Sequence, residues 1–207
     1  MMRYIFATNN PSKVKELKAM FEEAKLEMLS LADFGLSFEP TETGDTFEEN
    51  ATQKVTKTAQ FLKENGIDCE VENIAVLSDD SGLCIDALNG LPGVASANFM
   101  GRELPYTLRN SAIIDHMKDT KENERAARFV CVIACLFPCG KVETTNGTVE
   151  GQIAYEAKGE NGFGYDPIFF VPKYGKTTAE LSQEEKNKIS HRGNALQAMI
   201  EKLKVSV

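Results

Sequence analysis

A pair of adjacent carboxylates follows a short apolar segment in the first half of the chain. Asp79 and Asp80 come directly after residues 74–78, which read as a buried β-strand, and Ser81 and Gly82 follow them. Two carboxylates at the end of an apolar strand are costly unless they are exposed or neutralised by a cation. Magnesium prefers oxygen ligands, commonly one or two carboxylates together with substrate phosphates. The pair therefore predicts a magnesium site; the alternatives are a plain turn between strands and an aspartic-protease loop, which needs two paired aspartates in a mostly β chain.

A polar turn near the start of the chain has the composition of a phosphate-binding helix start. Residues 3–8 read as a short buried strand, and an apolar stripe at Val14, Leu17 and Phe21 predicts a helix after the turn. A helix N-terminus offers free backbone N–H groups and partial positive charge, which suit a phosphate. The alternative is an ordinary helix cap with a surface lysine, since the turn is not a Walker A loop. The candidate phosphate contacts are Thr8, Asn9, Asn10, Pro11, Ser12 and Lys13.

A second acidic segment precedes another predicted helix. Thr46 followed by Glu49 matches a capping box, and Gly66 is a plausible end of that helix. Most of the nearby carboxylates are expected to interact favourably with the helix dipole. Glu42 lies before the helix and is freer to reach a metal, and Lys54, two turns into the helix, could point at a phosphate. Each of these residues also fits an ordinary helix start.

A glycine-rich loop in the last third of the chain carries two aromatic residues. Gly162 and Gly164 flank Phe163, and Tyr165 and Asp166 follow; both aromatics are expected to be exposed. An aromatic ring held between glycines can lie flat against a nucleobase, where stacking contributes ~1–3 kcal/mol per base. Asp166 could accept a hydrogen bond from a ring N–H. The alternative is a loop that is fixed by aromatic packing.

A basic segment near the C-terminus joins two predicted helices, one capped by Ser182 and the next by Ser190. The break at Ser190 places His191 and Arg192 at a helix start, where they could face an anion or a purine carbonyl. Lys186 lies in the preceding helix. The alternative is a solvated basic junction.

The composition is that of an ordinary globular protein that can bury a sizeable core. The chain has 207 residues, of which 42% are hydrophobic and 26% charged. The net charge of -8 disfavours nucleic acid as a partner, but a single nucleotide stays open because a bound metal supplies positive charge. No apolar run approaches the ~20 residues that cross a bilayer. We therefore expect no membrane partner and a cytoplasmic location.

The five cysteines, none in a CxxC pair, fit reduced thiols that are mostly buried. Cys131 and Cys135 lie in a predicted strand, where an even separation puts both on one face. A zinc site is the alternative reading, although structural zinc sites usually show four closely spaced ligands.

The predicted strands and helices are mixed rather than strictly alternating. Further strands are expected at residues 83–88, 127–137, from 142 onward and at 148–154, and a helix at 106–118. This pattern predicts the α/β class (mixed α+β), with a central mixed β-sheet flanked by helices.

The motifs above, taken in their order, closely resemble the inosine triphosphate pyrophosphatase family, also called the deaminated-purine nucleoside-triphosphate pyrophosphatases. The resemblance covers essentially the whole chain. It is carried by the segments ATNNPSK (7–13), ETGDTFEENA (42–51), DDSGL (79–83), GLPG (90–93), GFGYDP (162–167), AEL (179–181) and SHRG (190–193).

The resemblance implies a single two-lobed domain over residues 1–207, with an elongated mixed sheet and an active-site cleft between the lobes. It also implies a homodimer and hydrolysis of ITP, dITP or XTP to the monophosphate and pyrophosphate with Mg²⁺. Thr8, Asn10, Lys13 and Lys54 match triphosphate-contacting positions, Glu42 and Asp80 match metal and water-activating carboxylates, and Ser81 matches a substrate contact. Phe163, Gly164, Tyr165 and Asp166 match a base-stacking loop, and Lys186, His191 and Arg192 match residues that recognise nucleotide and base.

Two other functions remain open on the residues. One is a nucleotide sensor that binds a triphosphate without turnover. The other is a pyrophosphatase for a pyrimidine or another modified nucleotide, because its phosphate and metal residues would be the same.

Overall fold

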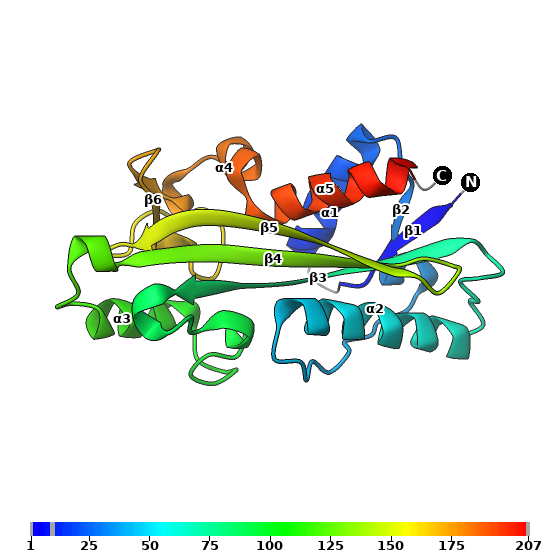
Figure 1. Cartoon of the computed structure of the whole chain (residues 1–207), viewed down its shortest axis with the longest axis horizontal. Helices are drawn as coiled ribbons and strands as arrows, with labels where there is room; N and C mark the ends of the chain where they lie inside the picture. Colours follow the sequence, from blue (N-terminus) through cyan, green and yellow to red (C-terminus); the bar gives the residue numbers. More distant parts are fainter. Residues whose placement is uncertain (1, 9–10, 206–207) are drawn as a thin grey trace. The chain divides into compact units, whose positions relative to one another are not determined.

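Seven strands of the described chain form one mixed sheet, in the order β2-β1-β3-β4-β5-β6-β7 (Figure 1). The computed structural model describes residues 2–8 and 11–205, and within these ranges the side chains at 11, 12, 16, 183, 187, 188 and 205 lie outside the description. β1 pairs in parallel with both β2 and β3, whereas β6 pairs antiparallel with β5 and β7. The strands are β1 (Arg3–Phe6), β2 (Met28–Ser30), β3 (Ile74–Ile85), β4 (Ala126–Leu136), β5 (Val142–Ile153), β6 (Phe169–Val171) and β7 (Lys176–Thr177). The predicted α/β class with a mixed sheet is confirmed.

The helices predicted from the sequence are all present in the described chain. They are α1 (Pro11–Glu23), α2 (Phe47–Glu64), α3 (Tyr106–His116), α4 (Gln183–Ile189) and α5 (His191–Val205). Both predicted capping boxes form, since Thr46 Oγ1 accepts from the Glu49 N–H at 3.1 Å and Ser182 Oγ from the Glu185 N–H at 3.2 Å. The predicted break at Ser190 is also confirmed, because Ser190 has extended backbone between α4 and α5.

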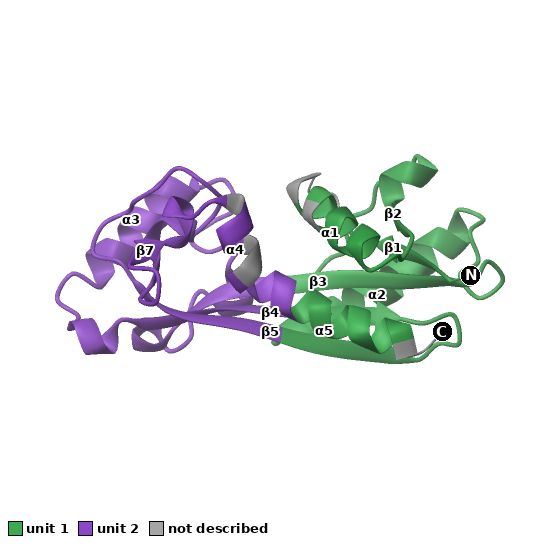
Figure 2. Cartoon of the chain, turned by 90° about the horizontal axis from the view of Figure 1, so that it is seen from above, with its two compact units in different colours: residues 1–80, 132–146, 195–207 green, residues 81–131, 147–194 purple. Residues whose placement is uncertain are grey.

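The chain divides into two compact units (Figure 2). Unit 1 comprises residues 1–80, 132–146 and 195–207, and unit 2 comprises residues 81–131 and 147–194. The division falls within β3, β4, β5 and α5, so each of these elements contributes residues to both units. The active-site cleft expected between two lobes stays a prediction.

In unit 1, helices cover both faces of the sheet. α1 and residues 195–205 of α5 lie on one face, and α2 lies on the other (Figure 1). α2 buries the apolar stripe predicted from its sequence, with Ala51, Val55 and Leu62 fully buried against strand residues such as Ile5 and Val76. This packing fixes the orientation of the polar face at the N-terminal end of α2.

In unit 2, α3 packs on a core built from β3, β4 and the segment around β6. Ile113 of α3 and Met117, which caps its C-terminal end, lie in one cluster with Phe129, Tyr165 and Phe169. This cluster places the glycine-rich loop at 162–166 against α3.

The predicted interruption of β3 at Asp79 and Asp80 is wrong. The prediction was a strand over residues 74–78, a turn, and a second strand from residue 83, whereas β3 runs without a break from Ile74 to Ile85. Asp79 and Asp80 are 3% and 6% exposed within it. Two carboxylates are tolerated inside a strand only where cations pair with them, and the lysines that do so are described below.

The two strands predicted from residue 142 and at 148–154 are likewise one strand, β5. A break between the two predicted strands would fall near Asn146-Gly147, a pair that is common in hairpin turns. Here both residues are extended, because β5 pairs along the sheet with β4. Ladder hydrogen bonds thus outweigh the local turn preference.

The five cysteines all lie in the described chain and none forms a disulfide. Cys131 and Cys135 are fully buried, as predicted. Burial, with a smaller contribution from the Glu143 carboxylate, raises the pKa of the Cys135 thiol to about 12, so this thiol stays protonated at neutral pH.

No helix in the described part of the chain is both long and apolar enough to span a bilayer.

Candidate active site

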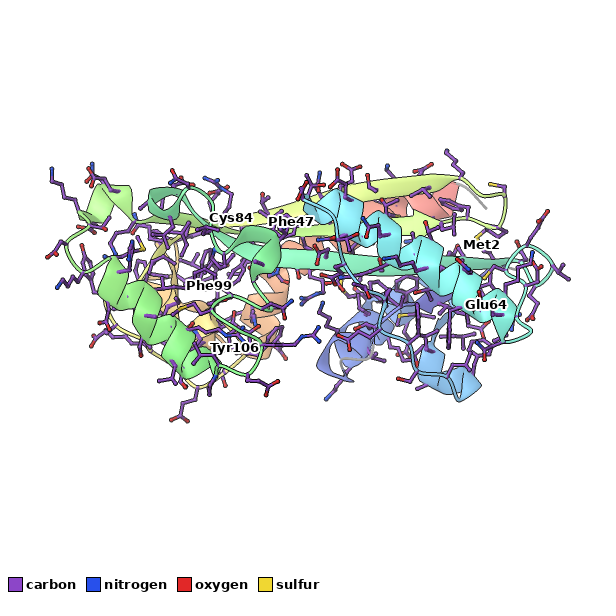
Figure 3. All side chains as sticks on the ribbon, turned by 90° about the horizontal axis from the view of Figure 1, so that it is seen from below. Met2, Phe47, Glu64, Cys84, Phe99 and Tyr106 are labelled. Carbon is purple, nitrogen blue, oxygen red and sulfur yellow. The ribbon has the colours of Figure 1, made fainter. Side chains whose placement is uncertain are left out.

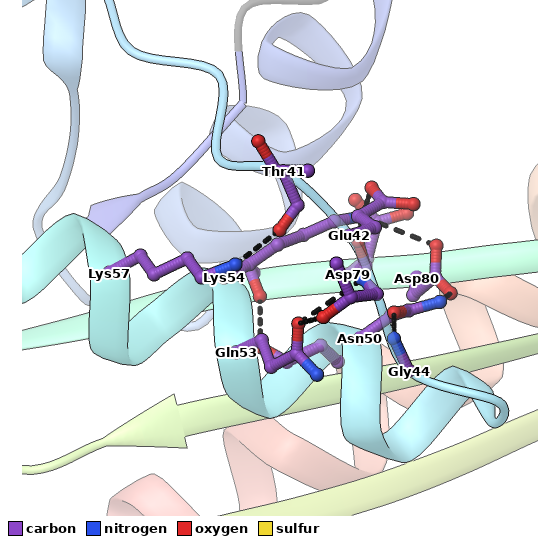
Figure 4. Close-up of polar contacts among 12 residues, drawn as sticks. Thr41, Glu42, Gly44, Asn50, Gln53, Lys54, Lys57, Asp79 and Asp80 are labelled. Atoms are coloured by element: carbon purple, nitrogen blue, oxygen red, sulfur yellow. Dashed lines mark hydrogen bonds and ion pairs between the residues drawn. The ribbon is translucent and has the colours of Figure 1, made fainter.

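Lys54 is the centre of a buried ionic cluster in unit 1. Its Nζ lies 2.5 Å from Glu42 Oε1 and 3.2 Å from Asp80 Oδ1, and it donates to the backbone carbonyl of Asp79 at 2.9 Å (Figure 4). The Lys54 side chain is 13% exposed and that of Asp80 9%, whereas Glu42 keeps 36% of its side chain in solvent. One ammonium group therefore holds a buried and a half-exposed carboxylate together.

Lys13 neutralises the other carboxylate of the pair. Its Nζ donates to both oxygens of Asp79, at 2.7 and 2.9 Å. Successive side chains of a strand point to opposite faces, so Asp79 meets the lysine of α1 and Asp80 meets the lysine of α2. Because each carboxylate has a lysine on its own side of the sheet, β3 continues through the pair instead of turning there.

The cluster shifts the proton affinities of Asp80 and Lys54. Burial, and to a lesser extent the Glu42 carboxylate, raise the pKa of Asp80 above its usual value, although Lys54 and Asn50 act in the opposite direction. Burial alone would lower the pKa of Lys54, but Asp80, Asp79 and Glu42 outweigh it, and the net pKa of Lys54 is raised. Lys54 therefore stays charged, while Asp80 is a stronger base than an exposed aspartate.

The loop that carries Glu42 is tied to the first turns of α2. The Gly44 N–H donates to Asn50 Oδ1 at 2.8 Å, and Thr43 Oγ1 donates to Gln53 Oε1 at 3.0 Å. A Cβ on Gly44 would lie 2.6 Å from the Cβ of Glu49, so this close approach requires glycine. The position of Glu42 near Lys54 is thus fixed by the hydrogen bonds of Thr43 and Gly44 to α2 as well as by the ion pair (Figure 4).

Asn50 is a member of the cluster that the sequence analysis did not single out. Its Nδ2 donates to Asp80 Oδ2 at 3.2 Å, and its side chain also receives the Gly44 N–H. The signal was present, since Asn50 and Lys54 are four residues apart on one helix and residues at that spacing share a face. Asn50 therefore orients the carboxylate oxygen that Lys54 does not contact.

The cluster fits a hard divalent cation such as magnesium. The Lys54 ammonium contacts Glu42 and Asp80 at once, so one positive centre can reach both carboxylates. Among the residues that the structure describes, no three or more His, Cys, Asp or Glu side chains are grouped closely enough to hold a metal. Magnesium commonly takes one or two carboxylates and completes its shell with waters and substrate phosphates. The donor set therefore suits magnesium bound together with a phosphate ligand.

The polar turn predicted to bind phosphate lies partly outside the description. Thr8 follows β1 and is half-buried, and Lys13 lies in the first turn of α1. Pro11 and Ser12 begin α1, with side chains outside the described set, and Asn9 and Asn10 lie outside the described residues. Of this turn, the structure brings Lys13 into contact with the carboxylate pair.

In unit 2, Asp166 organises the glycine-rich loop. Its Oδ2 accepts from Lys186 Nζ at 2.6 Å and from the Phe163 N–H at 2.7 Å, and its Oδ1 accepts from Thr178 Oγ1 at 2.9 Å. Asp166 is 4% exposed, whereas Phe163 is 51% exposed. Lys186 Nζ lies 5.1 Å from the centroid of the Phe163 ring. The structure thus brings three predicted residues together and presents an aromatic ring to solvent.

Gly162 has no room for a side chain. Its φ is +77°, and a Cβ there would lie 2.2 Å from Asp166 Oδ2 and 2.9 Å from Lys186 Nζ. The left-handed conformation and the close approach of a carboxylate both require glycine. This is why the Phe163 N–H can reach Asp166.

The expectation that Tyr165 is exposed is wrong. Tyr165 is 4% exposed, its hydroxyl donates to the Ser96 carbonyl at 2.9 Å, and its ring meets Tyr106 edge-on at 5.2 Å between centroids. Burial of the phenol, with a smaller effect of Tyr106, raises its pKa to about 12. A buried Tyr needs a partner for its hydroxyl, and the nearby carbonyl supplies one. Tyr165 therefore anchors the loop from inside.

Of the remaining predicted residues, His191 lines a small pocket in unit 2, whereas Arg192 and Ser81 are not part of its lining. His191 stacks on Phe129, with ring centroids 4.8 Å apart and planes 14° from parallel. Arg192 is buried at 4% exposure, and Ser81 on β3 is half-buried. Phe129 and Thr178 also line the pocket but were not singled out from the sequence. The sequence shows only an aromatic residue in a strand and a threonine at the start of a short 3₁₀ helix. The pocket is lined by Phe129, Val149, Asp166, Thr178, Lys186, Ile189, Ser190 and His191.

A lysine–carboxylate cluster on a mixed α/β sheet is typical of proteins that bind phosphate groups with a hard cation. Residues 4–202 match the model of the Ham1 family, and the chain belongs to this family. It is 46% identical over 198 residues to a relative from an Exiguobacterium species that is named dITP/XTP pyrophosphatase, covering 96% of this chain and 95% of that relative. A relative of the same name from Bacillus anthracis is 45% identical over 205 residues, covering 98% and 96%. These matches confirm the resemblance inferred from the motifs.

The fold is also that of solved Ham1 proteins. The Staphylococcus aureus Ham1 protein superposes with a TM-score of 0.85 at 38% identity, over 99% of this chain and 100% of that one. A HAM1 protein from Coxiella burnetii superposes with a TM-score of 0.85 at 36% identity, over 99% of both chains.

Replacement of Lys54 by methionine tests whether its charge holds the cluster. We expect Lys54→Met to lower the free energy of unfolding by about 3 kcal/mol, because Asp80 would keep a buried charge without its partner. The measurement is urea unfolding followed by circular dichroism. The control is Lys63→Met on the same helix, since the Lys63 side chain is 73% exposed and pairs with Asp68 at 3.2 Å. That change should cost less than about 1 kcal/mol, and equal losses in the two variants would contradict this role of Lys54.

Proposed function

We propose that this protein hydrolyses deaminated purine nucleoside triphosphates, namely dITP, ITP and XTP, to the nucleoside monophosphate and pyrophosphate. Membership of the Ham1 family and relatives named dITP/XTP pyrophosphatase support the assignment. The observation that carries it is the pairing of Glu42 and Asp80 through one buried cation. A sensor that binds nucleotides without turnover is the alternative, and pyrophosphate release distinguishes the two.

We assign the residues by the chemistry of the two units. In unit 1, the triphosphate is held by Thr8, Asn9, Asn10, Pro11, Ser12, Lys13 and Lys54, and Mg²⁺ by Glu42 and Asp80. In unit 2, Ser81, Phe163, Gly164, Tyr165, Asp166, Lys186, His191 and Arg192 serve the nucleoside. Within that set Tyr165 acts through the loop, since its side chain points into the core. Magnesium supplies positive charge that offsets the negative charge on the leaving pyrophosphate.

Asp80 is the proposed general base. It takes a proton from a water whose oxygen attacks the α-phosphorus, and the bond from that phosphorus to the pyrophosphate oxygen breaks. Lys13 and Lys54 then stabilise negative charge that spreads over the phosphoryl oxygens. Because Lys13 pairs with Asp79 and Lys54 with Asp80, the carboxylates and the triphosphate compete for the same two ammonium groups.

Selection of the base is assigned to the loop and pocket of unit 2. The Phe163 ring is exposed and flat stacking on it accepts any base, so discrimination must come from hydrogen bonds. Donors that face a 6-oxo group are left unpaired by the 6-amino group of an adenine nucleotide, and each such mismatch costs ~1–3 kcal/mol.

We further propose a homodimer that acts in the cytoplasm on the free nucleotide pool. The absence of disulfides among its five cysteines is consistent with a reducing compartment. Neither a membrane nor a nucleic acid is needed as a partner, and the net charge of -8 does not favour the latter.

A substrate panel tests the proposed activity. Pyrophosphate release with Mg²⁺ is compared by kcat/KM for dITP, ITP, XTP, ATP, GTP and dUTP. We expect the deaminated purines to exceed ATP by at least about tenfold, which is what one mispaired buried group corresponds to. Preference for a pyrimidine or another nucleotide would replace the substrate while keeping the chemistry. Binding without release from any nucleotide would establish a sensor and contradict the proposal.

Asp80→Asn tests the role of the general base. Loss of the base should lower kcat by about 10²–10⁴-fold with little change in the thermal unfolding temperature, because Lys54 keeps its ion pair with Glu42 and burial already disfavours the charged form of Asp80. The matched control is Asp86→Asn, since Asp86 is exposed and pairs with Arg128 at 3.1 Å away from the cluster. The control should keep the activity of the parent protein. Turnover of Asp80→Asn at the parent rate would remove Asp80 from the mechanism.

A further inference from the structure

A buried asparagine of α3 contacts the backbone of the glycine-rich loop. Asn110 is 4% exposed, and its Nδ2 donates to the Gly164 carbonyl at 3.0 Å. Gly164 is the residue that follows Phe163, the exposed aromatic of unit 2. Asn110 itself is buried behind the loop, so any effect on a ligand must pass through the position of the loop.

The loop needs such a contact because its backbone is intrinsically free. Gly162 and Gly164, on either side of Phe163, have φ values of +77° and +67°. Glycine loses more conformational freedom on ordering than any other residue. The Phe163 ring is 51% exposed, so packing alone does not fix it. The position of Phe163 is set by two hydrogen bonds to the loop backbone. Asp166 accepts from the Phe163 N–H, and Asn110 donates to the Gly164 carbonyl.

The bond from Asn110 is not explained by stability. A carbonyl can only accept, so Nδ2 must face Gly164, and this leaves Asn110 Oδ1 buried with no hydrogen-bond partner among the described residues. An unpaired buried acceptor costs about as much as one hydrogen bond contributes, or more. A leucine of similar size would remove the unpaired Oδ1 but would also leave the Gly164 carbonyl without its donor, so the two changes offset each other in folding. The distinctive effect of the asparagine is therefore on the position of the loop.

Other contacts of α3 support the same face of the loop. Tyr106, at the start of α3, meets Tyr165 edge-on, and the Arg109 guanidinium lies 4.6 Å from the Tyr106 ring centroid. Arg109 donates to the carbonyls of Ala97 and Gly101 at 2.8 Å each. Figure 3 labels Tyr106 at the start of α3 and Phe99, which lies between the two residues that Arg109 contacts. α3 is thus itself fixed, and it can act as a rigid support for the loop.

We propose that Asn110 is a positioning residue that holds Phe163 where its ring stacks on the nucleobase. The inference deepens the proposed function and rests on it only for the identity of the base. Asn110 contacts no member of the ionic cluster around Lys54. Its replacement should therefore weaken nucleotide binding and leave the chemical step intact.

The kinetic test uses Asn110→Leu, with Ser111→Ala as the matched control. Ser111 is the exposed neighbour on α3 and bonds within the helix to the Thr107 carbonyl at 3.0 Å. We expect Asn110→Leu to raise KM for dITP about three- to tenfold, the range of one net hydrogen bond, with kcat retained. In a Phe163→Ala background the same change should have no further effect on KM, because no ring is left to position. Additive effects would overturn the inference.

Thermal unfolding separates positioning from a merely structural role. Asn110→Leu should unfold at a temperature no more than about 3 °C below that of the parent protein, which corresponds to about 1 kcal/mol for a chain of this size. A larger fall together with a lower kcat would show general damage and overturn the inference. Asn110→Ala, which removes the amide without adding a branched side chain, serves if the leucine does not fit, with the same expected rise in KM.

Tryptophan fluorescence can measure the mobility of the loop without a substrate. The chain has no Trp, so Phe163→Trp makes a single tryptophan in the loop. Adding Asn110→Leu to this variant should lower its fluorescence anisotropy and increase its quenching by acrylamide, whereas adding Ser111→Ala should change neither. Unchanged anisotropy and quenching would overturn the positioning role. If the parent protein releases pyrophosphate from no nucleotide, the proposed function fails, and this fluorescence result still decides the inference.

Discussion

The ion pair between Lys54 and the carboxylates of Glu42 and Asp80 is the constraint on which the structure of unit 1 depends. β3 can carry two adjacent aspartates in its interior only because Lys13 and Lys54 approach from opposite faces of the sheet. This requires a helix on each face with a lysine near its N-terminal half, which α1 and α2 supply. It also fixes the loop before α2, since Glu42 must reach Lys54. Charge neutralisation thus links the strand, both helices and the loop.

The same interactions explain why this cluster is suited to phosphate chemistry. In the proposed function, a phosphate group competes with Asp79 and Asp80 for the lysines, and a divalent cation competes with the lysines for the carboxylates. Ligand and cation therefore favour each other's binding, as linked equilibria require. Unit 2 works by a different principle. There the polar side chains are paired within the loop, and in the proposed function the stacking of a base on Phe163 depends on how firmly residues 162–166 are held.

Local features of the fold were predictable from the sequence, and features that depend on distant partners were not. The capping boxes at Thr46 and Ser182 and the stripe of α2 involve residues a few positions apart, so their pattern is visible in the chain. The continuity of β3 was missed because Lys13 and Lys54 pair with aspartates 66 and 26 residues away. Of the predicted site residues, Glu42, Lys54 and Asp80 meet in unit 1, and Lys13 pairs with the adjacent Asp79. Tyr165 was misjudged because the carbonyl of Ser96, its partner, comes from 69 residues earlier in the chain, and Asn110 has no signal in its own segment.

In the proposed mechanism, Asp80 directs a water molecule to the α-phosphorus. The most direct test is hydrolysis of dITP in water labelled with ¹⁸O, followed by mass spectrometry of the two products. We expect one labelled oxygen in the phosphate of dIMP and none in pyrophosphate. Label in pyrophosphate would mean that the water attacks the β-phosphorus and would contradict the assignment of the cluster.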